Sequence, residues 1–255
     1  EAGARAGEDP EFVHQARVAI RRLRSALRLW APLLPPGFRA AFSPRWRDLA
    51  QLLGQARNLD VFVTETLPPM LAAFPETPAP GRLAHLAERR RQQWHREIRA
   101  AFEAPEFAAL VLSFTAALCA LPSDVSLVSL DDFLRRRLRR FAREVKTMAD
   151  ACSGHPEAHH RLRIAFKRLR YALEFAAPLL PAGKVRRYGV ATAEMQALLG
   201  AMNDLAVAEA LVAELRQRRT NDLVHGWLAG QAVLLHNLLP AALEGFLEAR
   251  PPWKG

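Results

Sequence analysis

Two short segments carry basic side chains at a spacing that could bind an anion. In each, a histidine is followed by cations at steps of three or four residues. The first row is His14, Arg17, Arg21, Arg24 and Arg28, and the second is His160, Arg163, Lys167 and Arg170. At 100° per residue, each row falls within one quadrant of an α-helix, with apolar residues opposite. Guanidinium groups bind phosphate oxygens in bidentate geometry and stay charged, so the pattern predicts phosphate binding.

The like charges of each row should destabilise the helix that carries them, so their presence requires an explanation. Like charges three or four residues apart destabilise a helix, and a helix that needs only solubility intersperses acids. The second row meets no acid until Glu174. An anion that completes each row explains this arrangement, and a merely solvated basic face is the alternative. Tyr171 is the one aromatic residue that we place at the edge of a basic quadrant.

The histidines could serve phosphate or metal. His155, His159 and His160 are close in sequence, but no HExxH or paired CxxC pattern accompanies them. We therefore expect no metal site and no cofactor. His14 and His160 lie in the first turns of their helices, where the helix dipole also favours anions. If they donate to phosphate, binding should strengthen as the pH falls through the histidine range.

The elements that must position these rows are helices. Strand patterns are nearly absent, and apolar residues recur at helical spacing. We predict helices near residues 10–31, 40–54, 56–74, 82–103, 106–120, 129–151, 157–178, 184–200, 202–219 and 221–248. Gly54 and Gly200 are placed just past helix ends. The short connections predict antiparallel bundles in an all-α fold.

An internal repeat relates the two rows. The segment from His14 to Pro35 matches the segment from His160 to Pro181 at a constant offset of 146 residues. Leu52-Leu53-Gly54 matches Leu198-Leu199-Gly200 at the same offset. One register across separated motifs indicates a tandem duplication. We therefore divide the chain into helical-bundle repeats at 1–122 and 123–255, related by a pseudo-two-fold axis.

Four polar residues follow the repeated glycines: Asn58, Asp60, Asn203 and Asp204. Helix capping is one interpretation, and orientation of the row arginines is the other.

Two further helices carry unusual charge. Residues 131–150 combine an apolar stripe (Leu134, Leu138, Phe141, Val145, Met148) with seven cations elsewhere. In 82–103, Arg90 lies within the apolar stripe, where an ion pair with Glu97 or a wet cavity would accommodate it.

Composition narrows the class of protein. The net charge of +10 indicates an anionic partner or surface. Cys119 and Cys152 form no disulfide framework and suit the cytoplasm. The longest apolar run, Phe107 to Leu121, is too short to span a membrane, so we expect none. No nucleotide-binding, hydrolase or kinase motif appears, so we expect a binding protein without enzymatic activity. A nucleic-acid-binding helical protein is the alternative, although its basic faces offer few aromatics for base stacking.

The motif His14-x-x-Arg17-x-x-x-Arg21-Arg22-Leu23-Arg24, its copy from His160, and the two Leu-Leu-Gly segments resemble the CHAD family, the conserved histidine α-helical domain. The resemblance covers essentially the whole chain. It implies two pseudo-symmetric helical bundles around a basic central groove or cavity that binds inorganic polyphosphate, with association with polyphosphate granules in bacteria. It adds Arg22 and Arg168 to the polyphosphate-binding residues of the two rows.

The resemblance also sets expectations about partners. Inorganic polyphosphate is the expected ligand, sulfate or phosphate ions could occupy the site in a crystal, and nucleic acid should be only a weaker competitor. The second copy departs from the first at two positions. Glu174 stands where the first copy has Arg28, and Ala206 where it has Asp60. The second half should therefore bind less strongly or orient its cations differently.

Overall fold

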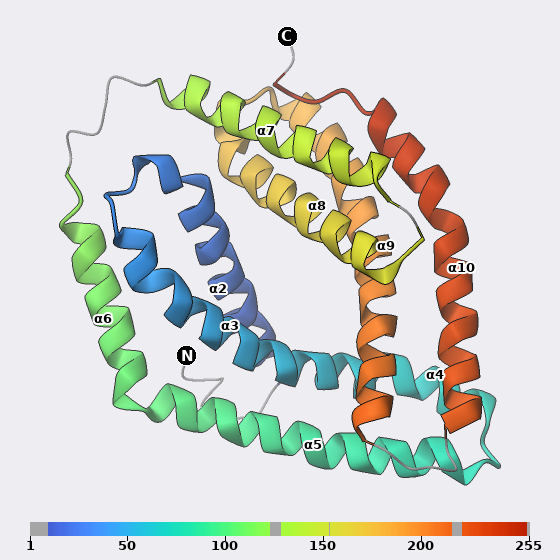
Figure 1. The fold of residues 1–255 in the computed structure, drawn as a ribbon. Coiled ribbons are helices and arrows are strands. Elements are labelled where there is room, and N and C mark those ends of the chain that lie inside the picture. Colours follow the sequence, from blue (N-terminus) through green and yellow to red (C-terminus); the bar gives the residue numbers. More distant parts are fainter. Residues whose placement is uncertain (1–9, 123–128, 153, 216–220, 254–255) are drawn as a thin grey trace. The chain divides into compact units, whose positions relative to one another are not determined.

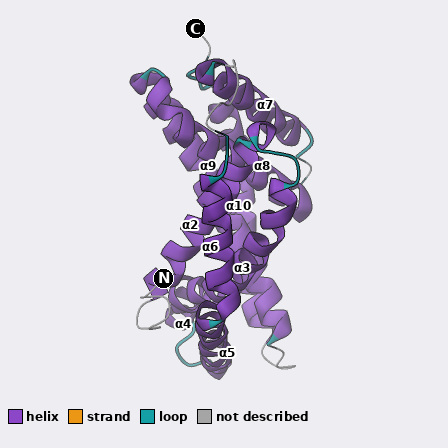
Figure 2. Ribbon diagram, turned by 90° about the vertical axis from the view of Figure 1, so that its left-hand side faces the viewer, coloured by secondary structure: helices purple, strands orange, loops and turns teal. Residues whose placement is uncertain are grey.

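The structure is a computed structural model that describes residues 10–122, 129–152, 154–215 and 221–253. Within these ranges the regular elements are all helices, joined by short loops (Figures 1 and 2). In chain order they are α2 (Pro10–Leu29), η1 (Ala31–Leu33), α3 (Phe38–Val61), η2 (Phe62–Thr66), α4 (Leu67–Ala73), α5 (Pro78–Glu103), α6 (Pro105–Cys119), α7 (Leu130–Asp150), α8 (Pro156–Ala176), η3 (Ala177–Leu179), α9 (Ala182–Glu214) and α10 (Asn221–Glu248). The all-α prediction is confirmed.

The chain divides into two compact units. The first comprises residues 1–126 and 211–224, and the second comprises residues 127–210 and 225–255. The first unit thus takes in a short segment from the C-terminal part of the chain, in addition to the region that the sequence assigns to the first repeat. By length and composition alone, α9 could cross a membrane, a criterion that the core helix of a soluble protein also meets.

In the first unit, α2, α3, α5 and α6 share one apolar core. Pro35, Pro36 and Gly37 lie in the connection between η1 and α3. Gly37 adopts a positive φ of 81° directly before α3. Phe114 of α6 packs edge-on against Trp46 of α3, with ring centroids 5.4 Å apart. Leu53 and Ile98 are fully buried in the same cluster. Each such side chain contributes roughly 1.5–3 kcal/mol by burial, so this core fixes α2 and α3 relative to each other.

In the second unit, α7 packs along α8 through the stripe that the sequence predicts. Leu134, Leu138, Phe141 and Val145 are buried on α7. The apolar face of α8 is likewise buried, from Ala165 and Phe166 to Leu173. Phe166 contacts Phe246 of α10, with ring centroids 4.6 Å apart. The basic row of α8 is therefore carried on a helix whose opposite side is fixed in a core.

The predicted helix ends at Gly54 and Gly200 are wrong. Helix α3 continues through Gly54 to Val61, and α9 runs unbroken through Gly200. Buried residues continue on both sides of each glycine, Leu53 and Ala56 in α3 and Leu199 and Met202 in α9. Glycine within a helix costs only about 1 kcal/mol, which this burial exceeds. Beyond Val61, the π-helical turn η2 interrupts the segment that the sequence treats as one helix to residue 74.

Candidate functional site

The basic row of the first unit lies on α2 and faces α3. The two helices run antiparallel, and their neighbouring positions show the register. His14 senses the charge of Arg57, a Cβ added to Gly54 would lie 3.9 Å from Arg17 Nε, and Arg24 senses the charge of Arg47. Figure 1 shows α2 and α3 side by side along this length. Arg17 of α2 therefore lies over Gly54 of α3, at a distance that a Cβ at position 54 would meet as ordinary contact.

All five residues of this row are half-buried, and Arg22 beside them is exposed. Two of them, Arg17 and Arg21, act on His14 through their charges. Burial first, then the positive charges of Arg57, Arg21 and Arg17, hold the pKa of His14 below its ordinary value, against the opposing charge of Glu11. His14 Nδ1 is buried and has no hydrogen-bond partner among the described residues. The arrangement is a concentrated positive field around a polar atom that an anion or water could satisfy.

Two arginines of α3 extend this field, although neither belongs to a basic row that the sequence pattern predicts. Arg47 and Arg57 lie on the α3 face that also carries Ala50 and Gly54. Burial and then the charge of Arg47 lower the pKa of Arg24, while Asp48 opposes them. Arg57 also forms an ion pair with the exposed Glu65 at 3.3 Å. The antiparallel hairpin would have pointed to both, because it places positions 47 and 57 opposite 24 and 14.

The second row lies on α8, and acids pair with one of its members, Arg170, and with the neighbouring Arg168. Arg168 pairs with Glu144 of α7, and Arg170 Nε lies 3.2 Å from Glu174 on its own helix. His160 is exposed, and Arg163 and Lys167 are half-buried. Glu174, which replaces the first copy's Arg28, therefore contacts the row directly. Positions equivalent to Arg47 and Arg57 are Ala193 and Asn203, so this row lacks their two added cations.

Two residues near these rows lie in environments that differ from those predicted by helical spacing. Tyr171, placed at the edge of the basic quadrant, is 2% exposed and lies beneath Arg170, whose Cζ is 5.4 Å from the ring centroid. Because Tyr171 is buried, it cannot stack on a base that approaches from the solvent. Ala19, one of the apolar residues opposite the first row on α2, is exposed.

Asp60 neither caps a helix nor holds a row arginine. It lies fully buried near the end of α3, where Arg91 Nε donates to its Oδ1 at 2.7 Å and His95 Nε2 donates at 3.0 Å. Arg91 also donates to Glu88 at 3.1 Å. Burial would raise the pKa of Asp60, but the hydrogen bonds from His95 and Arg91 outweigh it and leave the pKa below its ordinary value. This network joins α3 to α5.

The other three polar residues near the repeated glycines also lie within helices. Asn58 is inside α3, and Asn203 and Asp204 are inside α9, where Asn203 Nδ2 donates to Asp204 Oδ1 at 3.3 Å. The capping interpretation is therefore wrong for these residues, because the helices that they were thought to begin are continuous.

Arg90 has a different acidic partner from the one expected. Its Nη2 lies 3.1 Å from Glu214, and its Nη1 donates to Gln93 at 2.8 Å. Its guanidinium also lies over the ring of Trp94, 5.2 Å from the centroid. Glu97 instead accepts a hydrogen bond from Gln93. A partner 124 positions away in the chain cannot be found from helical spacing.

Helix α7 presents a second cationic face. Arg136, Arg139, Arg140, Arg143 and Lys146 are exposed, and no ion pair joins them to an acid of the described residues. Arg135 pairs with Asp131 at 2.6 Å, and Arg137 lies over the ring of Phe141. An exposed face of this kind serves either solubility or anion binding, and the geometry of α7 is compatible with both.

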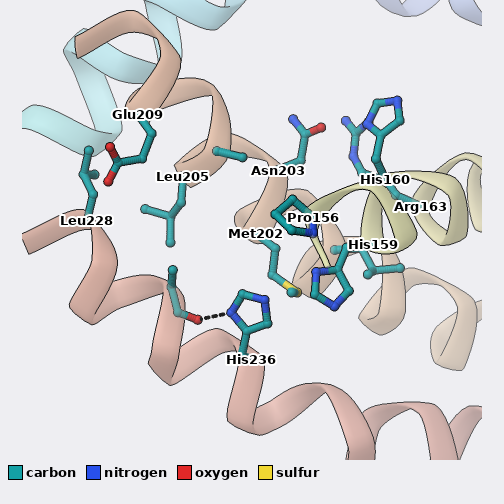
Figure 3. Close-up of a pocket in the computed structure, with 13 residues that line it drawn as sticks. Pro156, His159, His160, Arg163, Met202, Asn203, Leu205, Glu209, Leu228 and His236 are labelled. Atoms are coloured by element: carbon teal, nitrogen blue, oxygen red, sulfur yellow. Dashed lines mark hydrogen bonds between the residues drawn. The ribbon is translucent and has the colours of Figure 1, made fainter. Parts of the chain in front are cut away.

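A pocket opens at the N-terminal end of the α8 row. Its lining comes from α8, α9 and α10 and includes His160 and Arg163 together with Asn203 (Figure 3). The apolar side chains of Leu199, Met202 and Leu228 form much of its wall. Among the described residues of the second unit, the N-terminal end of the basic row therefore meets a pocket whose wall is largely apolar.

Comparisons with known proteins agree with this fold. The CHAD domain family model matches residues 1–213, so the chain belongs to the CHAD domain family. The crystal structure of the CHAD domain from the plant Ricinus communis superposes with a TM-score of 0.84 at 31% identity, covering 96% of this chain and 84% of that chain. PptA from Streptomyces chartreusis is similar in fold, with a TM-score of 0.69 at 17% identity, covering 95% of this chain and 90% of that one. No curated protein sequence matches the chain.

Proposed function

We propose that this protein is a binding module for inorganic polyphosphate and that the rows on α2 and α8 bind the anionic chain. The observation that carries the proposal is the field around His14. Three arginines from two helices act on a half-buried histidine whose Nδ1 has no partner among the described residues. Such a concentration of one charge is unfavourable in the absence of an anion. Membership of the CHAD domain family supports the same ligand.

The geometry suits a linear polyanion better than a single ion. Row members recur every three or four residues, so successive cations rise by about 5 Å along each helix. A chain of linked phosphates can contact several of them at once, and each contact releases bound counterions. Binding should therefore be tight at low salt and weaken steeply as salt increases.

The same proposal includes the absence of catalysis and a cellular place. The two rows consist of arginine, lysine and histidine side chains, which can hold a phosphate chain by charge and hydrogen bonds alone. We propose a cytoplasmic protein that associates with polyphosphate granules. Incubation of the chain with polyphosphate and Mg²⁺ or Mn²⁺ should release no phosphate, and measurable release would contradict a purely binding role.

The test replaces three row cations together, Arg17→Ala, Arg21→Ala and Arg24→Ala, and titrates long-chain polyphosphate at several salt concentrations. The matched control is Arg82→Ala, Arg89→Ala and Arg96→Ala, which removes the same charge from exposed positions of α5. The row variant should lose affinity and flatten the salt slope by about one for each lost contact. The control should change both much less. Equal losses in the two variants would show that net charge, not the row, binds the polymer.

The corresponding replacement on α8, Arg163→Ala, Lys167→Ala and Arg170→Ala, should have a smaller effect than the triple replacement on α2. Arg170 is already held by Glu174, and the flanking cations Arg47 and Arg57 have no counterparts here. A larger loss from the α8 variant would contradict this ranking.

A further inference from the structure

The pocket at the start of the α8 row has the size and lining of a small-molecule site. Its volume is about 340 Å³, within the range of ligand pockets in proteins. Three helices of the second unit form its walls, and the exposed lining is mostly apolar. Leu199, Met202 and Leu228 are themselves buried in the core, so these walls are held in place by packing that does not depend on a ligand.

The polar groups of the pocket suit a nitrogen heterocycle. His159 and His236 pack ring against ring, with centroids 4.8 Å apart and planes at 56°. His236 Nδ1 donates to the carbonyl of Ala232 at 2.7 Å. The Nε2 atom of the same neutral ring can therefore accept a hydrogen bond from another group. Asn203 adds an amide that can both donate and accept. An alkyl chain would leave these groups unsatisfied, whereas a base can stack on a ring and accept or donate at its edge.

The pocket and the basic row share two residues. His160 and Arg163 line the pocket and also begin the row that continues with Lys167. Figure 3 shows the side chains of His160 and Arg163 close together beside Asn203, apart from Glu209. Lys167 follows Arg163 after one helical turn, a rise of about 6 Å. A ligand that fills the pocket and leaves at this end would pass directly onto the cations.

The one carboxylate of the lining is already engaged. Glu209 of α9 pairs with His225 Nδ1 of α10, within the same unit. Its charge therefore opposes an anionic ligand less than a free carboxylate would. The basic residues at one end of the pocket, His160 and Arg163, favour a ligand that carries negative charge at that end.

We propose that the second unit binds a nucleoside polyphosphate, with the base in this pocket and the phosphates along the α8 row. The inference rests on the proposed phosphate-binding role of that row and adds a second ligand class to it. One base fits the pocket. A polynucleotide would need a succession of stacking surfaces, and Tyr171, the nearest aromatic of the row, is buried.

The experiment compares ATP with inorganic triphosphate by calorimetry, without divalent cations, on the full chain. The wild-type protein should bind ATP about five- to a hundredfold more tightly, which is the range for stacking one base. Ala232→Phe places a ring in the pocket and should reduce ATP affinity to that of triphosphate, with triphosphate binding unchanged. Ala229→Phe, one turn away on α10 at an exposed position outside the lining, is the matched control and should retain the difference.

The outcomes separate this inference from the proposed function. Equal wild-type affinities for ATP and triphosphate would overturn the base pocket while leaving phosphate binding intact. Tight binding of decanoate in place of ATP would overturn it in favour of an apolar chain. Failure of triphosphate and long-chain polyphosphate alike would overturn the proposed function itself. Ala206→Leu, at another lining position, gives a second pocket variant if Ala232→Phe does not fold.

Discussion

At the scale of single residues, the environment of each cation matters more than its presence. His14 and His160 are equivalent in the repeat, yet His14 is half-buried against Arg57 whereas His160 is exposed beside a pocket. Arg24 has a cationic neighbour on α3, and Arg170 has an acid on its own helix. Since opposite charges compensate and like charges do not, the two rows should differ in how strongly they attract an anion.

His14 gives a prediction about pH. Its lowered pKa keeps the ring neutral at neutral pH in the unbound protein, and a bound phosphate favours the protonated form. Affinity for polyphosphate should therefore rise as the pH falls from about 7.5 to about 5.5. His14→Gln should reduce that rise, and His85→Gln, at an exposed position of α5, should not. Calorimetry at several pH values measures the effect, and an unchanged pH profile in His14→Gln would contradict it.

Asp60 gives a prediction about stability. The substitution Asp60→Asn removes the charge that Arg91 and His95 share, and leaves a half-buried guanidinium less compensated. The free energy of unfolding should fall by about 2–3 kcal/mol at neutral pH. Because the folded pKa of Asp60 lies below 3.8, its contribution is present above that pH and is lost as the pH falls further.

Urea unfolding of the full chain measures the change at Asp60. The control is Glu65→Gln, which removes an exposed partner of Arg57 and should cost less than about 1 kcal/mol. A loss of the same small size in Asp60→Asn would mean that the buried network contributes little to stability.

At the scale of helices, the two glycines that looked like helix ends are interior positions. The repeat still produces equal local structure, since η1 and η3 begin at Ala31 and Ala177, the same offset that relates the basic rows. What the glycines share with a true helix end is composition only. Their neighbours are buried on both sides, and continuous burial favours a continuous helix.

Substitution of the glycines tests this interpretation. Gly54→Ala and Gly200→Ala should each raise the free energy of unfolding by about 0.5–1 kcal/mol. An added Cβ meets only ordinary contact at Gly54 and nothing within 4 Å at Gly200. Gly37→Ala should instead lower it by about 1–2 kcal/mol, since φ is 81° there. Destabilisation by Gly54→Ala or Gly200→Ala would contradict interior helical positions.

At the scale of the whole molecule, a net charge of +10 attracts any polyanion, so specificity must come from the sites. The exposed cations of α7 contribute to the general field, whereas the α2 row adds burial and a fixed register with α3. The two basic rows offer no exposed aromatic side chains on which the bases of a nucleic acid could stack. The protein should therefore prefer a bare phosphate chain to DNA or RNA of equal charge.

Competition measures this preference. Long-chain polyphosphate should displace a fluorescent single-stranded DNA oligonucleotide at equal total charge, at one fixed salt concentration. The DNA should not displace bound polyphosphate under the same conditions. Displacement of polyphosphate by DNA would favour the nucleic-acid interpretation of the basic rows.

The sequence by itself determined the helical class, the duplication and the basic rows, because period and offset are properties of local order along the chain. Only the tertiary structure decided which groups meet across helices: Arg57 with His14, Glu214 with Arg90, Asp60 with Arg91 and His95, and the pocket at His160. Such contacts join positions far apart in the chain, and helical spacing carries no information about them. It also decided that α3 and α9 continue past their glycines, since burial against neighbouring helices outweighs the intrinsic preference of one residue.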